Sequence, residues 1–443
     1  MNRIEHLRAC FEGAIPSLIA TCAADGTPNV AWLSQVQYVD GRHVALSFQF
    51  FNKTRANVLA NPLAEVIVSD PATAANHRLQ VRYCRTETAG PLFENMKARL
   101  SGVASHTGMS EVFRLQGADI YEVLTVTELP GARSQPARQR PARLPALRAA
   151  SARLAACHDL DGLLNALLDA LDQDFAISHG MVLMADAGGE RLYTVASRGY
   201  PASGAGFEVG LGEGIVGVAA RERTPIRISF GTAEYSYARA ARASAVAAGA
   251  AADQTVIPFP GLADPRSQLA LPILGGDRLH GVIYLESGDE LRFDYDDEDA
   301  LMALAHQLAT AIAGMECDEA EPDQVAAPAA ASGAAVKVRH YGFDHSVFLD
   351  GDYVIKGVAG AVLWRLLQQY GEDGRVEFSN RELRLDPALG LPEVGDNLEA
   401  RLLLLQRRLA DRQACVQLEK AGRGRLRLRL NRPLLLEHVE RPA

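Results

Sequence analysis

Short runs of alternating or β-branched residues, separated by turn formers, cover most of residues 1–129. The Asp25-Gly26 and Asp40-Gly41 pairs favour tight turns between such runs. Helices are expected as one short helix before the first strand and at 53–60 and 92–101. The pattern predicts a small antiparallel sheet that closes into a barrel-like α+β unit, because a closed sheet has no unpaired edges. The expected strands are Leu18–Cys22, Val30–Tyr38, His43–Phe50, Ala64–Ser69, Arg78–Arg85 and Asp119–Thr127.

The middle of the chain mixes helical and strand patterns. Apolar residues recur at helical spacing over Leu147–Leu171, with Asp161 as the expected cap midway. A G-x-G-x-x-G motif runs from Gly212 to Gly217, but the helix that it opens is only about two turns long before Pro225, too short for a dinucleotide-binding crossover. The other expected elements are strands at Met181–Met184, Arg191–Ser197, Ser267–Ile273 and Gly281–Glu286, and helices at Ile215–Arg221 and Asp296–Ile312.

The last hundred or so residues begin with two strands around the Asp350-Gly351-Asp352 turn and end with a hairpin that turns at 422–424. Three stretches of helical spacing lie between them. This order predicts a small α+β domain. Its expected elements are strands Val336–Tyr341 and Ser346–Ile355, helices Val358–Tyr370, Asn380–Leu385 and Asp396–Gln413, and the hairpin Val416–Leu430.

Two stretches without periodicity divide the chain into three domains. Residues 130–145 are rich in proline and arginine and contain no acid, whereas residues 317–335 are first acidic and then rich in alanine and proline. Both are expected to be linkers. The predicted domains are therefore 1–129, 146–316 and 336–443.

Composition and charge narrow the class of protein. With 48% hydrophobic and 22% charged residues, the chain is typical of globular proteins. A net charge of −9 argues against a chain that binds nucleic acid over its whole surface. No signal-like start and no long uncharged apolar run are present, so we expect a cytoplasmic protein that does not enter membranes. The six cysteines are far apart and indicate reduced thiols rather than disulfides or a metal site.

The stretch from Pro16 to Pro62 resembles the pyridoxamine-5′-phosphate-oxidase-like FMN-binding split barrels, with a strand, a D-G turn, two strands and then K-x-x-x-N-x-x-x-N-P. The resemblance implies a homodimer that holds FMN at the subunit interface. Lys53 and Thr54 would occupy the phosphate-binding positions. Ser47 and Gln49 would line the preceding strand, and Gln80 would reach the isoalloxazine ring.

This barrel departs from the family at two positions. Trp32 stands where the family has a phosphate-binding arginine, and Thr54 replaces the second member of a basic pair. Lys53 and the start of its helix still favour an anion. A barrel that binds another ligand or none stays open as an alternative. No pair of residues resembles a general acid and base, so the sequence predicts binding rather than turnover and singles out no catalytic residue.

The middle domain resembles a GAF domain, an α/β sandwich. The matching segments are V-G-L-G-E-G-I-V-G with its following P-x-x-I, at 209–228, and SQLALPILGGDRLHGVIYLES, at 267–287. The family implies a small-molecule pocket between the sheet and the variable segment Ser229–Arg266. The ligand of that pocket is unknown, and His179, His280 and His306 are too isolated to suggest a haem.

The C-terminal domain resembles the winged-helix effector domains of OmpR-type response regulators. Between Arg401 and Arg432 there are ten Lys/Arg against two acids, a local charge of +8. Basic residues on a helix and a hairpin are typical of proteins that neutralise DNA phosphates. The candidate nucleic-acid contacts are Arg407 and Arg408 on the helix and Arg423 and Arg425 in the hairpin.

Two leucines argue against a helix that reads DNA bases. Leu398, Leu402, Leu405 and Leu409 form one apolar stripe, which leaves Leu403 and Leu404 off it, beside Arg407. Leucine cannot hydrogen-bond with base edges. Either this helix lies in a protein interface, or the hairpin provides most of the DNA contact.

Three hypotheses follow from the sequence. The first is a cytosolic signalling or transcriptional regulator, in which a flavin or a small effector acts through the barrel and GAF domains on a winged-helix output. The second is an FMN-dependent oxidoreductase with regulatory domains. The third is an assembly module whose winged helix binds protein.

Overall fold

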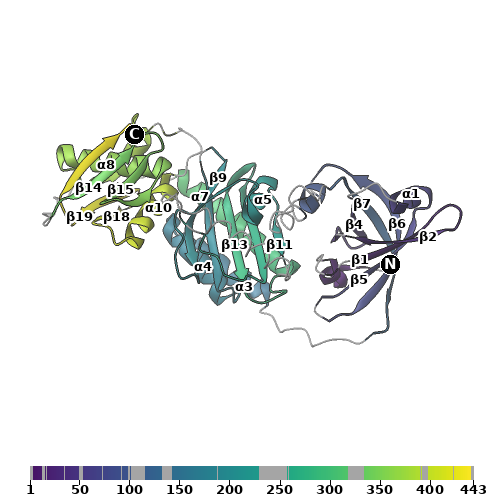
Figure 1. Ribbon diagram of the computed structural model, residues 1–443. Helices are drawn as coiled ribbons and strands as arrows, with labels where there is room; N and C mark the ends of the chain where they lie inside the picture. Colours follow the sequence, from purple (N-terminus) through teal and green to yellow (C-terminus); the bar gives the residue numbers. More distant parts are fainter. Residues whose placement is uncertain are drawn as a thin grey trace.

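The computed structural model describes residues 3–11, 15, 17–33, 35–48, 53–71, 73–90, 92–97, 100, 115–131, 142–186, 188–228, 257, 259–317, 334–389, 391, 398–422 and 424–440. Figure 1 shows three sheet-based domains in a row, with the N-terminus in the first and the C-terminus in the last. We refer to them as the N-terminal, middle and C-terminal domains. Among the described residues, no helix is long and apolar enough to span a membrane. The five cysteines whose side chains are described are free thiols.

The N-terminal domain is a seven-stranded antiparallel sheet in the order β2-β1-β5-β6-β7-β4-β3. Its core surrounds Val44, Val66 and Leu79, whose side chains are completely buried. The prediction of a small antiparallel sheet with interposed helices is confirmed. The elements are η1 (Glu5–Phe11, a 3₁₀ helix), β1 (Ser17–Cys22), β2 (Pro28–Leu33), β3 (Val36–Tyr38), β4 (His43–Phe48), α1 (Lys53–Ala60), β5 (Leu63–Ser69), β6 (Asn76–Glu87) and β7 (Gly117–Glu128), and residues 92–97 are also helical.

The expected strand Val30–Tyr38 is in fact two strands at opposite edges of this sheet. Strand β2 pairs with β1, whereas β3 pairs with β4. Only two residues separate Leu33 from Val36, so the chain spans at most about 11 Å between them. The two edges must therefore lie close together, which curls the sheet into a half-open barrel. The sequence pattern could not show this, because both strands have the same extended alternation.

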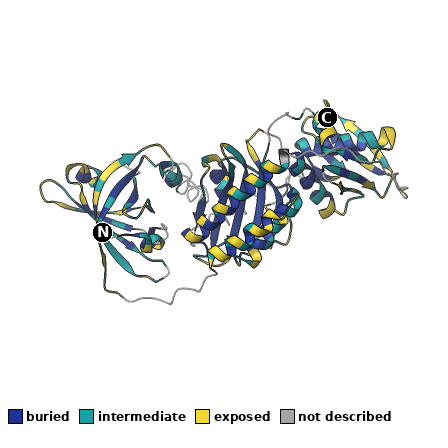
Figure 2. Ribbon diagram, turned by 180° about the vertical axis from the view of Figure 1, so that it is seen from behind, coloured by how far each residue is buried: buried dark blue, intermediate teal, exposed yellow. Residues whose placement is uncertain are grey.

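The middle domain is a six-stranded antiparallel sheet in the order β10-β9-β8-β13-β12-β11. Leu269 and Leu271 of β12 pack with α3, α4 and α7, whereas Ala270 packs with α5 on the opposite face. Figure 2 shows the exposed outer sides of the helices over the buried sheet. The elements are α3 (Arg143–Ala155), α4 (Leu160–Gln173), β8 (His179–Ala185), β9 (Arg191–Arg198), β10 (Glu208–Gly210), α5 (Gly214–Glu222), β11 (Ile226–Ile228), β12 (Ser267–Gly275), β13 (Arg278–Ser287) and α7 (Tyr295–Cys317).

The single helix expected over Leu147–Leu171 is two helices, α3 and α4. The cap of α4 is Asp159 rather than Asp161, since the Asp159 side chain accepts a hydrogen bond from the Gly162 amide at 2.8 Å. Asp161 lies in the first turn. The apolar spacing continues across the break because both helices bury a face in the same core.

The C-terminal domain contains two small sheets, in the orders β16-β15-β14-β20 and β17-β19-β18. The predicted strands, helices and hairpin are present, but β17 and β20 were not expected. Strand β20 runs parallel to β14, with Leu434 opposite Val336, a pairing too distant in sequence for local patterns to reveal. The elements are β14 (Val336–Tyr341), β15 (Ser346–Leu349), β16 (Asp352–Ile355), α8 (Gly357–Asp373), β17 (Glu377–Ser379), α9 (Asn380–Leu385), α10 (Leu398–Asp411), β18 (Val416–Gly422), β19 (Arg425–Leu430) and β20 (Leu434–Val439).

Neighbouring domains are joined by specific contacts. The middle and C-terminal domains share one continuous apolar core, in which Leu404 and Leu405 of α10 belong to the same cluster as Val195 of β9. In Figure 1, α10 lies on the side of its domain that faces the middle domain. The N-terminal domain is held more sparsely, by an ion pair between Arg8 and Asp299 at 2.8 Å and by other polar contacts.

Candidate functional site

Lys53 and Thr54 begin α1, directly after β4. Lys53 is exposed, and the Thr54 hydroxyl accepts a hydrogen bond from Asn29 Nδ2 at 2.9 Å. The first amides of a helix have no intrahelical partner and carry partial positive charge. Among the residues that the structure describes, the start of α1 therefore offers a phosphate group the accessible Lys53 cation and the first amides of a helix.

Arg55, the next residue, is already engaged. Its Nη1 donates to both carboxylate oxygens of Asp119, at 2.6 and 2.8 Å, and its Nη2 donates to the Thr86 hydroxyl at 3.0 Å. The Arg55 and Asp119 side chains are only 16% and 8% exposed. Arg55 thus ties α1 to β6 and β7, and Lys53 is the accessible cation of this helix start.

Ser47 and Gln80 lie far apart within one copy of the chain. Ser47 is opposite Ala118 on β7, whereas Gln80 is opposite Thr125. These two positions on β7 are about 23 Å apart along the strand, at about 3.3 Å per residue. One copy therefore brings Ser47 to the end of β4 that precedes α1, but does not bring Gln80 there. Gln49 lies outside the described residues.

Edge strand β2 has one exposed apolar face. Val30 and Trp32 point to the same side of the strand and are 65% and 70% exposed. Trp32 is the residue that replaces the arginine expected from the family. Exposed large apolar side chains on an edge strand are typical of surfaces that bind another protein chain.

A cavity of about 490 Å³ lies in the middle domain, between the sheet, the start of α5 and residues 259–265. Its apolar wall contains Phe207, Phe259 and Tyr284. The ring centroid of Phe259 lies 5.0 Å from that of Phe207 and 5.8 Å from that of Tyr284. This volume is typical of a small-molecule site. The cavity lies between the sheet and the variable segment, where the GAF resemblance implies a pocket. Residues 229–256 and 258 of that segment lie outside the described residues.

The polar end of this cavity is Glu286, whose side chain is almost completely buried. Its Oε1 accepts a hydrogen bond from the Tyr284 hydroxyl at 2.7 Å, and its Oε2 accepts one from the Leu262 amide at 2.8 Å. A buried carboxylate beside aromatic rings suits a ligand with an apolar body and an N–H or cationic group. Sequence reasoning missed Glu286, although an acid within an otherwise apolar strand was a usable signal.

The glycine-rich loop that precedes α5 has a structural explanation. Gly212 and Gly214 have φ values of +87° and +59°, which favour glycine. A Cβ at Gly217 would lie 2.2 Å from the Gly210 carbonyl oxygen. Because α5 is nine residues long and β10 is antiparallel to β9, this motif is not part of a parallel β-α-β unit. The expectation that no dinucleotide binds here stays a prediction.

Comparison with known families agrees with both of these domains. Residues 4–124 match the family model of pyridoxamine 5′-phosphate oxidase, and residues 157–313 match that of the GAF domain. The chain thus combines a split barrel of the FMN-binding type with a GAF domain. No curated protein matches it.

Solved structures resemble single domains of the chain. An FMN-binding protein from Syntrophomonas wolfei is 16% identical over 29% of this chain and 88% of its own, with a TM-score of 0.26. The GAF domain of an Acinetobacter phosphoenolpyruvate-protein phosphotransferase is 18% identical over 40% of this chain and 96% of its own, with a TM-score of 0.32. Free methionine-R-sulfoxide reductase from Neisseria meningitidis is 17% identical over 40% of this chain and 92% of its own, with a TM-score of 0.30.

The two candidate DNA-contacting arginines of α10 are bound within the protein. Arg407 donates to the Val195 carbonyl oxygen at 3.0 Å and to Asp161 Oδ1 at 2.5 Å, both in the GAF domain. Arg408 is 8% exposed and donates to the Val354 carbonyl oxygen at 2.9 Å. Burial, and then the charge of Arg412, lowers the pKa of Arg408 from its ordinary value. Their contact with DNA stays a prediction.

The hairpin presents a row of arginines on one face of β19. Arg425, Arg427 and Arg429 lie on the face of β19 opposite the buried Leu426 and Leu428. Arg427 pairs with Glu377 at 2.6 Å, and Arg429 pairs with Glu419 at 2.8 Å. Arg423 lies outside the described residues.

Three histidines that the sequence did not indicate meet in the C-terminal domain. His340 Nδ1 is 2.9 Å from His438 Nδ1, and His340 Nε2 is 3.3 Å from His345 Nδ1. Burial, and then the charges of His438 and His345, lowers the pKa of His340 to about 4. The His340 ring is also stacked on Trp364. In the part of the chain that the structure describes, no group of His, Cys, Asp and Glu is arranged to hold a metal ion.

Proposed function

We propose that this protein is a ligand-sensing regulator, in which the GAF pocket and the flavin-type barrel control the C-terminal domain. The observation that carries the proposal is the segment 203–208, which contacts both the GAF pocket and α10. Phe207 lines the pocket. A Cβ at the adjacent Gly206 would lie 3.7 Å from Leu404 Cδ1 of α10.

Polar contacts at both ends of this segment strengthen the connection. The Ser203 hydroxyl donates to Asp411 at the end of α10, and Glu208 pairs with Lys356 of the C-terminal domain at 3.7 Å. A ligand that moves Phe207 would therefore displace residues that hold the C-terminal domain. Coupling of this kind shifts the balance between docked and released arrangements.

A ligand screen tests this coupling. Small compounds with an aromatic or aliphatic body and an amine are added to the full chain, and thermal stability is measured for the natural protein and for Glu286→Gln. We expect compounds that stabilise the natural protein but not the variant, and that change deuterium uptake in α10. Compounds that depend on Glu286 but leave uptake in α10 unchanged would contradict the proposal.

For the output, we propose a winged helix that contacts DNA. The order of α8, β17, α9, α10 and the β18–β19 hairpin supports a winged helix. Arg407, Arg408, Arg423 and Arg425 are the proposed contacts, and a local charge of +8 supports them. The apolar character of Leu403 and Leu404, which cannot hydrogen-bond with base edges, favours a second candidate, in which α10 serves as a protein-binding helix.

For the barrel, we propose FMN bound between two copies of the chain. Lys53 and Thr54 would hold the phosphate, with Ser47 and Gln49 beside it. Since Gln80 cannot reach this site within one copy, Gln80 of a second copy would contact the flavin ring. The exposed face of β2, with Val30 and Trp32, supports pairing of two barrels. Bound FMN supplies redox chemistry, and we propose sensing rather than turnover as its use.

The Lys53→Ala variant is expected to weaken FMN binding about 10- to 150-fold, because a charge-assisted hydrogen bond to phosphate contributes about 1.5–3 kcal/mol. Flavin absorbance and fluorescence quenching on titration measure this change. The matched control is Arg3→Ala, which removes a cation whose side chain is 78% exposed and should leave affinity unchanged. If the natural protein takes up no FMN, the flavin proposal is wrong.

A further inference from the structure

The basic helix and hairpin of the C-terminal domain meet two carboxylates of the GAF domain. Lys420 Nζ of β18 lies 2.8 Å from Asp159 Oδ2, and Arg407 Nη2 of α10 lies 2.5 Å from Asp161 Oδ1. Arg407 also donates to Asn165 Oδ1 at 3.1 Å. Two cations of the surface proposed to bind DNA phosphates are thus paired with carboxylates of the same chain.

These carboxylates are held at the start of α4. Asp159 is the N-cap, and its Oδ1 accepts from the Gly162 amide while its Oδ2 faces Lys420. Partial burial acts to raise the pKa of Asp159, but hydrogen bonds from Lys420 and Gly162 outweigh it, and the net pKa is below the usual value. Asp161 is the second residue of α4 and lies in its first turn, where negative charge is favourable. The Asp159 side chain therefore remains anionic at neutral pH.

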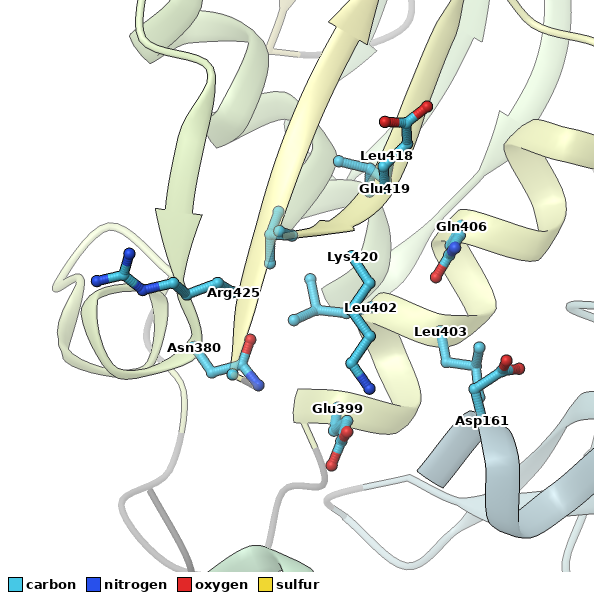
Figure 3. A pocket seen from close by; sticks show the side chains of 12 residues that line it. Asp161, Asn380, Glu399, Leu402, Leu403, Gln406, Leu418, Glu419, Lys420 and Arg425 are labelled. Carbon is cyan, nitrogen blue, oxygen red and sulfur yellow. The ribbon is translucent and has the colours of Figure 1, made fainter. Parts of the chain in front are cut away.

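Apolar contacts surround the ion pairs. Leu403 and Leu404 are 6% and 3% exposed, and Leu404 lies against Gly206 of the GAF domain. Figure 3 shows Asp161 of α4 beside Leu403. Both residues line a cavity of about 60 Å³, together with Leu402 and Lys420. The leucines that are unsuitable for reading bases are covered by the GAF domain in this arrangement.

We propose that Asp159 and Asp161 form an intramolecular clamp that holds α10 and the hairpin against the GAF domain. In a second role, the clamp pairs with Lys420 and Arg407, which would otherwise be available to bind a polyanion. The clamp rests on the proposed DNA-binding output only for its second role. Carboxylates at this position replace phosphates as partners of Lys420 and Arg407. Release of the clamp would expose a cationic helix and hairpin together.

The test is the double variant Asp159→Asn/Asp161→Asn in the full chain. Asparagine is as good an N-cap as aspartate, so α4 keeps its start while two charges are lost. The matched control is Asp169→Asn/Asp172→Asn, which changes the net charge equally on the same helix. Asp172 is exposed, and Asp169 pairs with Arg198 of β9 rather than with a residue of the C-terminal domain.

Two measurements are made on the natural protein and on both variants. Deuterium uptake in α10 and β18 is expected to be about fivefold faster in the Asp159/Asp161 variant and unchanged in the control. Losing the stabilisation that about one exposed ion pair provides increases local opening by about this factor. Affinity for a 30-base-pair DNA duplex of arbitrary sequence, followed by fluorescence anisotropy, is expected to rise about fivefold over that of the control.

The outcomes separate the clamp from the DNA output. Unchanged uptake in the Asp159/Asp161 variant overturns the clamp, whatever happens with DNA. If the natural protein already binds the duplex as tightly as the variant, the masking role is overturned while the DNA output stands. If uptake rises and no protein binds the duplex, the clamp between domains is supported and the DNA output is wrong.

Discussion

The Gly217→Ala variant is expected to lose about 3 kcal/mol of stability in its GAF domain, although alanine is the better helix former. The added methyl group would lie 2.2 Å from the Gly210 carbonyl oxygen and 3.0 Å from the Gly212 amide nitrogen. Both contacts are with backbone, which cannot move away without disrupting the loop between β10 and α5. Amide hydrogen exchange in β12 and β13 should become about 100-fold faster.

Gly314→Ala is the matched control for this substitution. Gly314 is also in a helix, α7, and a Cβ there would meet no atom within 4 Å. Alanine at this position should stabilise the domain by about 0.5–1 kcal/mol. Changes in stability of opposite sign for Gly217→Ala and Gly314→Ala would show that close packing, not helix propensity, requires a glycine at position 217. Equal exchange rates in Gly217→Ala and the natural protein would contradict this explanation.

The Arg227→Met variant should destabilise the GAF domain by about 3–5 kcal/mol, because it leaves a buried carboxylate without its counter-charge. Arg227 Nε lies 2.8 Å from Glu298 Oε2, and the two side chains are 1% and 9% exposed. The guanidinium also lies over the Tyr295 ring and donates to the Phe293 carbonyl oxygen. Hydrogen exchange in β11 and α7 measures the loss.

A double variant separates loss of charge balance from loss of packing. Arg227→Met/Glu298→Leu removes both charges and should recover much of the stability lost by the single change. The surface variant Arg266→Met is the control, since the Arg266 and Asp264 side chains are 38% and 56% exposed and their pair should contribute at most about 1 kcal/mol. If the double variant is no more stable than Arg227→Met, unpaired charge is not the cause.

Periodicity predicted the elements whose pairing is local. The hairpin β18–β19 and the helix α1 have the positions that alternation and spacing indicate. Strand β20 was not predicted, because its partner β14 lies about a hundred residues earlier and only the folded chain joins them. The alternating segment Val30–Tyr38 was predicted as one strand, because alternation does not show at which residue a chain changes from one sheet edge to the other.

The candidate sites also divide into residues with a local sequence signal and residues whose roles depend on distant partners. Lys53 could be found from its position before a helix and from a family motif. Glu286 stood out only as an acid within an apolar strand, and the partners that define the roles of Glu286 and Asp159, Leu262 and Lys420, are distant along the chain. The sequence did identify Leu403 and Leu404 as unsuitable for reading DNA. Contact of α10 with the GAF domain supplies the physical reason for apolar residues there.

The continuous apolar core between the GAF and C-terminal domains bears on how the chain unfolds. Side chains such as Val195 and Leu405 belong to one cluster, whereas Val44 and Val66 belong to a separate one in the barrel. Loss of either half of the shared core exposes the other half to water. The GAF and C-terminal domains therefore form one cooperative unit that melts together, and the barrel forms a second. A mutation in the C-terminal domain would thus reduce the thermal stability of the ligand pocket, even where it touches no residue of that pocket.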